Sequence, residues 1–371
     1  MSAPYVSASA PTATAFVSTG SLDEEVSRRI ELCRVIGIFL IVIHHITPLN
    51  AGQFGDWADY GPMRGYVQFG LTKAATGLLS MISGYLLWSK PFEARPLKHF
   101  KGKARTLLIP MLICNVAIAG LLAVLESLGL PHKEKFAGLA SGEWRVWLDA
   151  VLGVAEYPAN QALHFIRDLL VCNVLAMVLA PLFRRAPWIV FLLSSWVVLL
   201  DLDGLLIQRD DIFILFMLGG IFGHLRLPTQ PLDRFALPLT LTWLAWAAYV
   251  FSTQAYVYVA DDMVNATVQL ANRVLAAIAV WTLTARLASS SWGERISQYA
   301  RYAFFVFLVH MPVDFLLFNV WMRAFGRESY MLYWFSSAFI VTAIAIVLFH
   351  AMRRFAPTPL GVLTGGRIVR K

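Results

Sequence analysis

The stretch Cys33-Arg-Val-Ile-Gly-Ile-Phe-Leu-Ile-Val-Ile-His-His-Ile46 places Arg34 and His45 eleven residues apart in a strongly apolar run. Eleven steps of about 100° return a helix to within roughly 20° of its starting direction, so both side chains project from one face. Their separation along the axis is roughly 16 Å, about half a bilayer. Ionisable groups are costly in hydrocarbon and usually face a polar cavity. The pair therefore predicts a functional cavity, whereas His44 points roughly 80° away.

The composition is that of an all-α integral membrane protein. Hydrophobic residues make up 58% of the 371 residues and charged residues only 15%, where soluble domains carry about 25% charge. The mean hydropathy is +0.62. Three cysteines lie in apolar segments without metal-ligand spacing, so neither a metal site nor a disulfide framework is expected. The net charge of +8 does not indicate nucleic acid, because the basic residues cluster between hydrophobic segments.

Hydropathy predicts about ten transmembrane helices. Residues 1–27 are expected to form a disordered cytoplasmic tail, 28–355 a multi-span membrane domain, and 356–371 a basic cytoplasmic tail. The loop 129–160, with Trp144 and Trp147, is expected to contain an amphipathic segment on the outer face. The ten predicted spans cover residues 31–49, 66–88, 105–128, 161–183, 188–207, 211–225, 236–258, 267–288, 302–321 and 331–352.

Charge bias sets the predicted orientation. With the N-terminus inside, 20 of the 31 Lys and Arg residues fall on the cytoplasmic side, 7 fall on the opposite side and 4 lie within spans. Such an excess on one side places both termini in the cytoplasm. Lys73 and Arg273, near span ends, are expected to snorkel toward the interface.

The segment 90–105 holds six Lys or Arg residues and one Glu. One reading is a loop that sets topology and touches anionic headgroups. The other is a binding surface for a polyanionic cytosolic ligand such as coenzyme A, in which Lys101, Lys103 and Arg105 contact the ligand as the chain enters the next span.

Three other groups of residues are candidates for lining a cavity. Ser83-Gly84-Tyr85 reads as close helix packing or as backbone that lets a ligand approach. His164, Arg167 and Asp168 lie within about one turn and read as an ion pair or as part of a site. His310 and Asp314 repeat an i, i+4 arrangement, in which a carboxylate either orients an imidazole or forms a buried structural pair.

These landmarks, in this order, resemble the membrane-bound acyltransferase 3 family of carbohydrate O-acyltransferases. The resemblance rests on Arg34 with His45, on Ser83-Gly84-Tyr85, on the basic run into Leu-Ile-Pro110, on His164-Phe-Ile-Arg-Asp-Leu-Leu and on Phe305-Val-Phe-Leu-Val-His310. Relatives tend to carry Arg-x-x-Arg in the basic loop, where this chain has Lys101, Lys103 and Arg105. The tryptophan that usually follows the histidine corresponding to His164 is replaced here by Phe165 or Ile166.

The resemblance implies transfer of an acyl group, expected to be acetyl, from cytosolic acyl-CoA to a hydroxyl of an envelope or exported polysaccharide in the bacterial inner membrane. His45 would be the general base or a transient acyl carrier, and Arg34 would position the donor. No bound cofactor is expected, since the thioester is already activated. The expected partners are the lipid bilayer, acyl-CoA, a carbohydrate acceptor and polysaccharide-assembly machinery. The alternative is a transporter of a glycolipid or small anion, which no inverted repeat supports.

Overall fold

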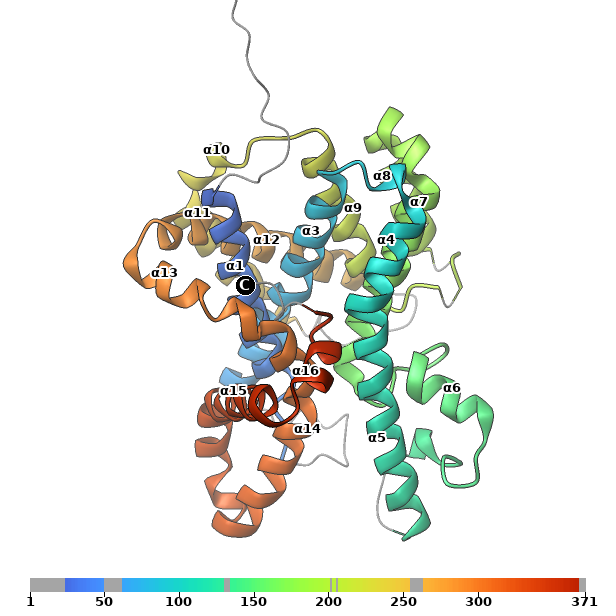
Figure 1. Ribbon diagram of the computed structural model, residues 1–371. Coiled ribbons are helices and arrows are strands. Elements are labelled where there is room, and N and C mark those ends of the chain that lie inside the picture. The colour runs from blue at the N-terminus through green and yellow to red at the C-terminus, as the bar shows by residue number, and fades with distance from the viewer. Residues whose placement is uncertain are drawn as a thin grey trace, which may run out of the picture.

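The computed structural model describes residues 24–49, 62–129, 134–200, 202–204, 206–253 and 263–366, and every regular element in these ranges is a helix (Figure 1). The main helices are α1 (Glu24–His44), α3 (Ala74–Trp88), α5 (Ile109–Ser127), α7 (His164–Arg185), α8 (Pro187–Leu199), α9 (Asp210–His224), α11 (Ala236–Ser252), α12 (Met263–Ala288), α14 (Ala300–Phe325) and α15 (Tyr330–Phe355).

Shorter helices lie between or after them: α2 (Pro62–Gly65), η2 (Tyr66–Leu71), η3 (Phe92–Ala94), α4 (Pro96–Lys103), η4 (Ala104–Leu108), η5 (Glu134–Phe136), α6 (Trp144–Leu152), η6 (Gln161–Leu163), α10 (Gln230–Asp233), α13 (Ser291–Ser297), η7 (Arg327–Ser329) and α16 (Pro357–Leu363). Of these, η2 and η4 are single π-helical segments. Each of the ten predicted spans therefore contains a helix.

Within the described ranges, five helical stretches are long and apolar enough to cross a membrane: Pro96–Ser127, Gln161–Arg185, Val264–Ala288, Ala300–Phe325 and Arg327–Phe355. Two further apolar helices, α8 and α11, are shorter. The length and apolar composition of these helices thus support a multi-helical membrane protein. The count of ten spans stays a prediction.

Several predicted boundaries are wrong. The first helix begins at Glu24, inside the predicted tail 1–27, and residues 1–23 lie outside the described residues. Most of the basic segment is helical and not a loop: η3 covers Phe92–Ala94, and α4 begins at Pro96, whose missing N–H leaves no helical bond unmade in the first turn. From there a helix continues into α5. The predicted C-terminal tail begins with α16, and the loop 129–160 contains the helix α6.

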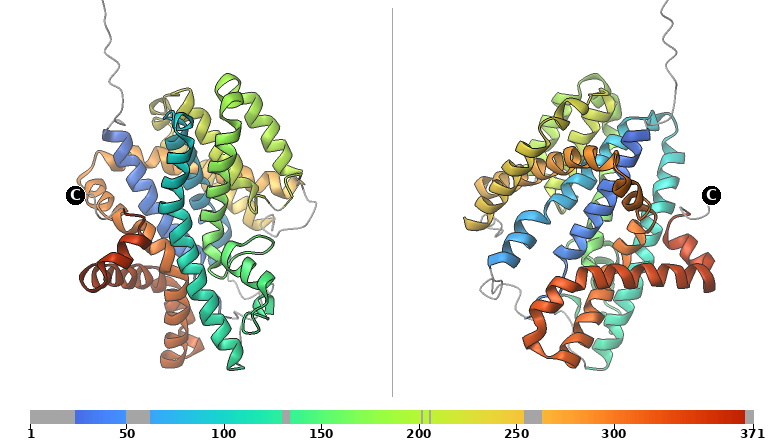
Figure 2. Two further views of the ribbon diagram at one scale, coloured as in Figure 1. Left: turned by 45° about the vertical axis from the view of Figure 1, so that its right-hand side comes forward. Right: turned by 90° about the vertical axis from the view of Figure 1, so that its left-hand side faces the viewer.

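Helix α1 lies inside the bundle and contributes to three separate hydrophobic clusters (Figures 1 and 2). Ile41 packs in a cluster with α7 and α9, Val42 and Ile46 pack with α14 and α15, and Ile30 and Cys33 pack with α3 and α12. These contacts occupy most of the helix circumference. The face that carries Arg34 and His45 lies between the side toward α3 and the side toward α14.

Candidate active site around His45

Arg34 and His45 share one face of α1, as the spacing predicts. The helix ends at His44, and the backbone N–H of His45 still bonds to the carbonyl of Ile41 at 3.1 Å, so the helical direction holds through His45. The Arg34 side chain is exposed and makes no hydrogen bond or ion pair with a described residue. Glu31 interacts with Arg34 electrostatically only, so the guanidinium keeps its hydrogen-bond donors available to a ligand.

The hydrogen bond made by the His45 ring decides which nitrogen is basic. Its Nδ1 lies 2.9 Å from the carbonyl oxygen of Ile41, one turn earlier. A carbonyl can only accept, so Nδ1 carries the proton of the neutral ring and the lone pair is on Nε2. This arrangement presents a proton-accepting nitrogen in the direction away from the backbone of α1.

Two histidines from other helices adopt the same arrangement. The Nδ1 of His310 donates to the carbonyl of Phe307 at 2.8 Å, and the Nδ1 of His164 donates to that of Gln161 at 2.7 Å. The ring of His310 meets the ring of His45 edge to face with centroids 5.3 Å apart, and His164 interacts electrostatically with His45. The structure thus brings His310 of α14 against the ring of His45 at the end of α1, and places His164 of α7 within electrostatic reach of His45.

His164 and His310 each have a buried Nε2 atom with no hydrogen-bond partner among the described residues. Buried polar atoms in native proteins are almost always bonded, so unmade bonds of this kind mark a place where a ligand or water belongs. The two atoms lie on α7 and α14, and α14 packs directly against α1.

His44 has a different environment from His45. Its Nδ1 lies 2.9 Å from both the carbonyl of Gln68 and the hydroxyl of Thr72. Gln68 belongs to η2 and Thr72 follows it, and the side-chain amide of Gln68 reaches back to the carbonyls of Ile43 and His44 at 3.4 Å. His44 therefore attaches the end of α1 to the π-helical segment.

Asp314 is not the partner of His310, so the reading in which it orients that imidazole is wrong. Its carboxylate accepts hydrogen bonds from the backbone N–H and the hydroxyl of Thr47, at 2.7 Å and 2.6 Å, and from the hydroxyl of Tyr333 at 2.6 Å. The i, i+4 spacing places the two side chains on one face of α14, but the three donors from α15 and from the end of α1 occupy the carboxylate.

At the start of α7, the structure shows an ion pair between Arg167 and Asp168 at 2.8 Å, both largely buried. Asp168 also accepts from the backbone N–H of Gln208. His164 takes no part in this pair and packs its ring 4.9 Å from that of Tyr157. The ion-pair reading is thus confirmed for Arg167 and Asp168, whereas His164 belongs with His45.

The sequence pattern did not predict a buried charged cluster that interacts electrostatically with His164. Asp211, at the start of α9, bonds to both Arg209 and Arg273 at 2.9 Å, and Lys73 interacts electrostatically with all three. Arg273 is only 8% exposed, so its predicted snorkelling is wrong. The run Arg209-Asp-Asp211 at the start of an apolar helix is the sequence feature that could have predicted it, since carboxylates favour a helix N-terminus.

The three cations of the basic segment do not face one ligand. Lys101 and Arg105 are exposed, lie one turn apart and make no hydrogen bond or ion pair with a described residue. Lys103 lies on the opposite side, where it lines a cavity of about 220 Å³ against α7 together with His99 and Asn173. Any shared ligand would meet Lys101 and Arg105 only.

The Ser83-Gly84-Tyr85 motif serves helix packing. A Cβ atom on Gly84 would lie 1.8 Å from the carbonyl oxygen of Phe216, and one on Gly219 would lie 2.0 Å from that of Met81. Helices α3 and α9 therefore touch backbone to backbone, in the manner of small-residue contacts between membrane helices. The hydroxyl of Ser83 bonds within its own helix, to the carbonyl of Leu79.

Comparison with known proteins identifies the family of the chain. Residues 27–350 match the acyltransferase 3 family, described as an acyltransferase domain. The succinoglycan biosynthesis protein ExoH of Rhizobium meliloti (strain 1021) is 30% identical over 354 residues, which cover 93% of this chain and 94% of that protein. No solved structure matches the chain. Since the match spans nearly all of the described helices, the chain belongs to the acyltransferase 3 family and is a multi-pass membrane acyltransferase.

Proposed function

We propose that this acyltransferase moves an acyl group, expected to be acetyl, from acyl-CoA to a hydroxyl of a cell-envelope or exported polysaccharide or of its lipid-linked precursor. The observation that carries the proposal is His45, whose basic Nε2 is set by the Nδ1 bond to Ile41 and which shares its helix face with the unpaired cation Arg34. The name of the similar protein ExoH, which refers to succinoglycan biosynthesis, supports a polysaccharide acceptor.

The chemistry requires a base and a site for negative charge. The acceptor hydroxyl loses its proton to Nε2 of His45 as its oxygen attacks the thioester carbonyl. The C–S bond then breaks, and coenzyme A leaves as a thiolate that takes up the proton. Arg34 lies roughly 16 Å along the helix from His45, so it would hold the anionic part of the donor while the pantetheine arm spans the distance between them.

We further propose the membrane orientation that the distribution of Lys and Arg predicts. Ten spans with both termini in the cytoplasm of a bacterium place the start of α1, Lys101 and Arg105 at the inner face of the cytoplasmic membrane, where acyl-CoA is made. His45 then lies toward the outer half of the bilayer. Acyl-CoA and a carbohydrate would be the small-molecule partners, with polysaccharide-assembly proteins beside them.

The test uses the purified full-length protein in lipid nanodiscs with acetyl-CoA labelled in the acetyl group. We expect slow release of free coenzyme A, or label on the protein, and loss of both in the His45→Ala variant. A transporter would neither cleave the thioester nor acquire label. Mass spectrometry of envelope and secreted polysaccharides, with and without the protein, identifies the acceptor, and unchanged acylation of every glycan would refute the proposal.

A further inference from the structure

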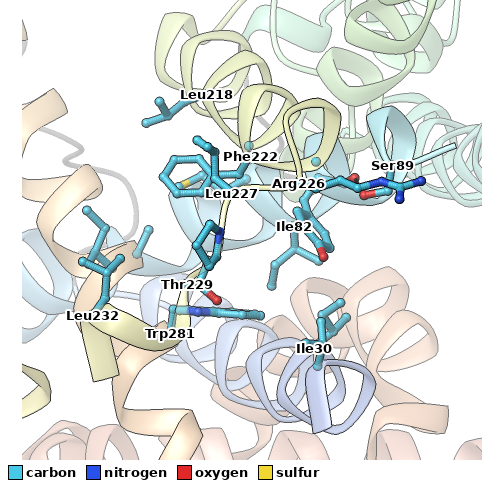
Figure 3. A pocket seen from close by; sticks show the side chains of 18 of the residues that line it. Ile30, Ile82, Ser89, Leu218, Phe222, Arg226, Leu227, Thr229, Leu232 and Trp281 are labelled. Atoms are coloured by element: carbon cyan, nitrogen blue, oxygen red, sulfur yellow. Dashed lines mark hydrogen bonds between the residues drawn. The ribbon is translucent and has the colours of Figure 1, made fainter. Parts of the chain in front are cut away.

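A second cavity, separate from the histidines, opens at the opposite end of α1. It has a volume of about 730 Å³, within the range of about 300–1,000 Å³ typical of small-molecule sites. Its walls come from α1, α3, α9, α12 and the connection 225–232, and they are formed mostly by aliphatic and aromatic side chains such as Ile82, Phe222 and Trp281 (Figure 3). Neither Arg34 nor His45 lines this cavity.

Two cations lie at one edge of the apolar space. Arg226 and Lys90 both line it and are solvent-exposed. Their side chains make no hydrogen bond or ion pair with a residue of the described ranges. Figure 3 shows the Arg226 side chain beside Ser89, with the apolar residues filling the rest of the wall. The cavity thus has one cationic edge and an otherwise hydrocarbon-like interior.

The backbone at Arg226 indicates that its side chain has a use. Arg226 follows the end of α9 with φ of 51°, and among the described residues no other non-glycine residue has a positive φ. The N–H of Leu227 bonds to the carbonyl of Phe222 at 3.1 Å, so Arg226 occupies the position that glycine usually takes at a helix end. A side chain in the left-handed region is strained, and such strain is retained mainly where the residue serves a function.

We infer that this groove binds one anionic phospholipid of the surrounding bilayer, with an acyl chain along the apolar wall and its phosphate at Arg226 and Lys90. A free phosphate would leave the apolar space unfilled, whereas a zwitterionic lipid has no net charge to balance the two cations, because its own ammonium group already offsets its phosphate. Basic pockets between membrane helices bind anionic headgroups in this way on the cytoplasmic side, and the charge bias of the chain places this edge there.

The experiment measures the thermal unfolding of the full-length protein in detergent with added phosphatidylglycerol or with phosphatidylcholine of the same acyl chains. We expect phosphatidylglycerol to raise Tm by several degrees more than phosphatidylcholine does, because a ligand of the folded state stabilises it. The selective shift should vanish in the Lys90→Gln/Arg226→Gln variant and persist in Arg185→Gln, which removes an exposed arginine that does not line the groove.

Arg226→Gly keeps the proposal testable if the double variant folds poorly. Glycine relieves the backbone strain, so the Tm of this variant in phosphatidylcholine should equal or exceed that of the wild type. The extra rise in Tm with phosphatidylglycerol should become smaller, because the cation is lost. An equal selective shift in wild type and double variant, or none in wild type, would overturn the proposal. So would an equal shift from glycerophosphate, which would mean a phosphate site, or loss of the shift on adding coenzyme A, which would assign the groove to the donor.

Discussion

Asp314 holds the backbone that follows His45: its Oδ2 accepts hydrogen bonds from both the N–H and the hydroxyl of Thr47, two residues beyond the imidazole. The other carboxylate oxygen accepts from Tyr333 on α15. A buried carboxylate with three donors fixes the end of α1 relative to α14, which carries His310. The position of the proposed base therefore depends on two helices that come late in the chain.

Asp314→Asn should lower the turnover of acyl transfer while leaving the KM for acyl-CoA nearly unchanged. The amide oxygen replaces only part of the acceptor capacity, and each charge-assisted bond contributes about 1.5–3 kcal/mol. Asn319→Ala, which removes an exposed bond to the same helix, is the control. Steady-state kinetics in nanodiscs measures both parameters, and an altered KM with unchanged turnover would contradict a role in holding His45.

The adjacent histidines should respond differently to alanine. His45→Ala should abolish transfer with little change in membrane abundance, because the basic Nε2 is lost. His44→Ala should retain a substantial part of the activity and lose about 1 kcal/mol of stability, the worth of a typical hydrogen bond to Gln68. Transfer assays on both variants decide the matter. Full activity in His45→Ala would remove the base from the mechanism, and selective loss in His44→Ala would place the cavity on the other face.

The basic residues of α4 and η4 allow donor binding to be tested with matched variants. Lys101→Gln/Arg105→Gln should raise the KM for acyl-CoA at least about tenfold, since losing one charge-assisted contact to phosphate suffices for that change. Lys103→Gln should leave the KM nearly unchanged, because Lys103 faces α7. An equal change in KM in the two variants, or no change in either, would mean that the basic segment only sets the membrane topology.

Backbone contact between α3 and α9 predicts a strong effect of one methyl group. Gly84→Ala should destabilise the folded protein by about 1–3 kcal/mol, the usual consequence of overpacking, because its Cβ would overlap the carbonyl of Phe216. Gly120→Ala, with nothing within 4 Å of the added atom, should be neutral or stabilising. Thermal unfolding in detergent compares the two. An unchanged Tm for Gly84→Ala would mean that the helices separate more easily than this contact implies.

Membrane orientation can be checked with reporter fusions. Fusions after residue 95 and after Lys371 should report the cytoplasm, and one near residue 140 should report the outside, as the distribution of Lys and Arg predicts. A cytoplasmic signal at residue 140 would overturn both the count of spans and the side on which the donor enters.

The sequence was sufficient for the features that depend on local periodicity. Hydropathy located the ten main helices of the described residues, and the 11-residue interval placed Arg34 and His45 on one face, because helix geometry determines which residues share a side. Boundaries were less accurate where a short-range feature intervened, as at Pro96, which starts a helix inside the segment predicted to be a loop. The family resemblance rested on the same ordered landmarks and is confirmed by the match over residues 27–350.

Partners across the bundle depended on tertiary structure. Asp314 lies one turn from His310 on its own helix, yet its carboxylate bonds to Thr47 and Tyr333, and Arg273 enters the interior to meet Asp211. Nothing in local sequence specifies such pairs, because a buried charge is stabilised by whichever opposite group the helix packing brings within reach. The same packing brings His310 against His45 and places His164 within electrostatic reach of it. Helical periodicity decides which way each side chain points, and only the arrangement of the helices decides what it meets.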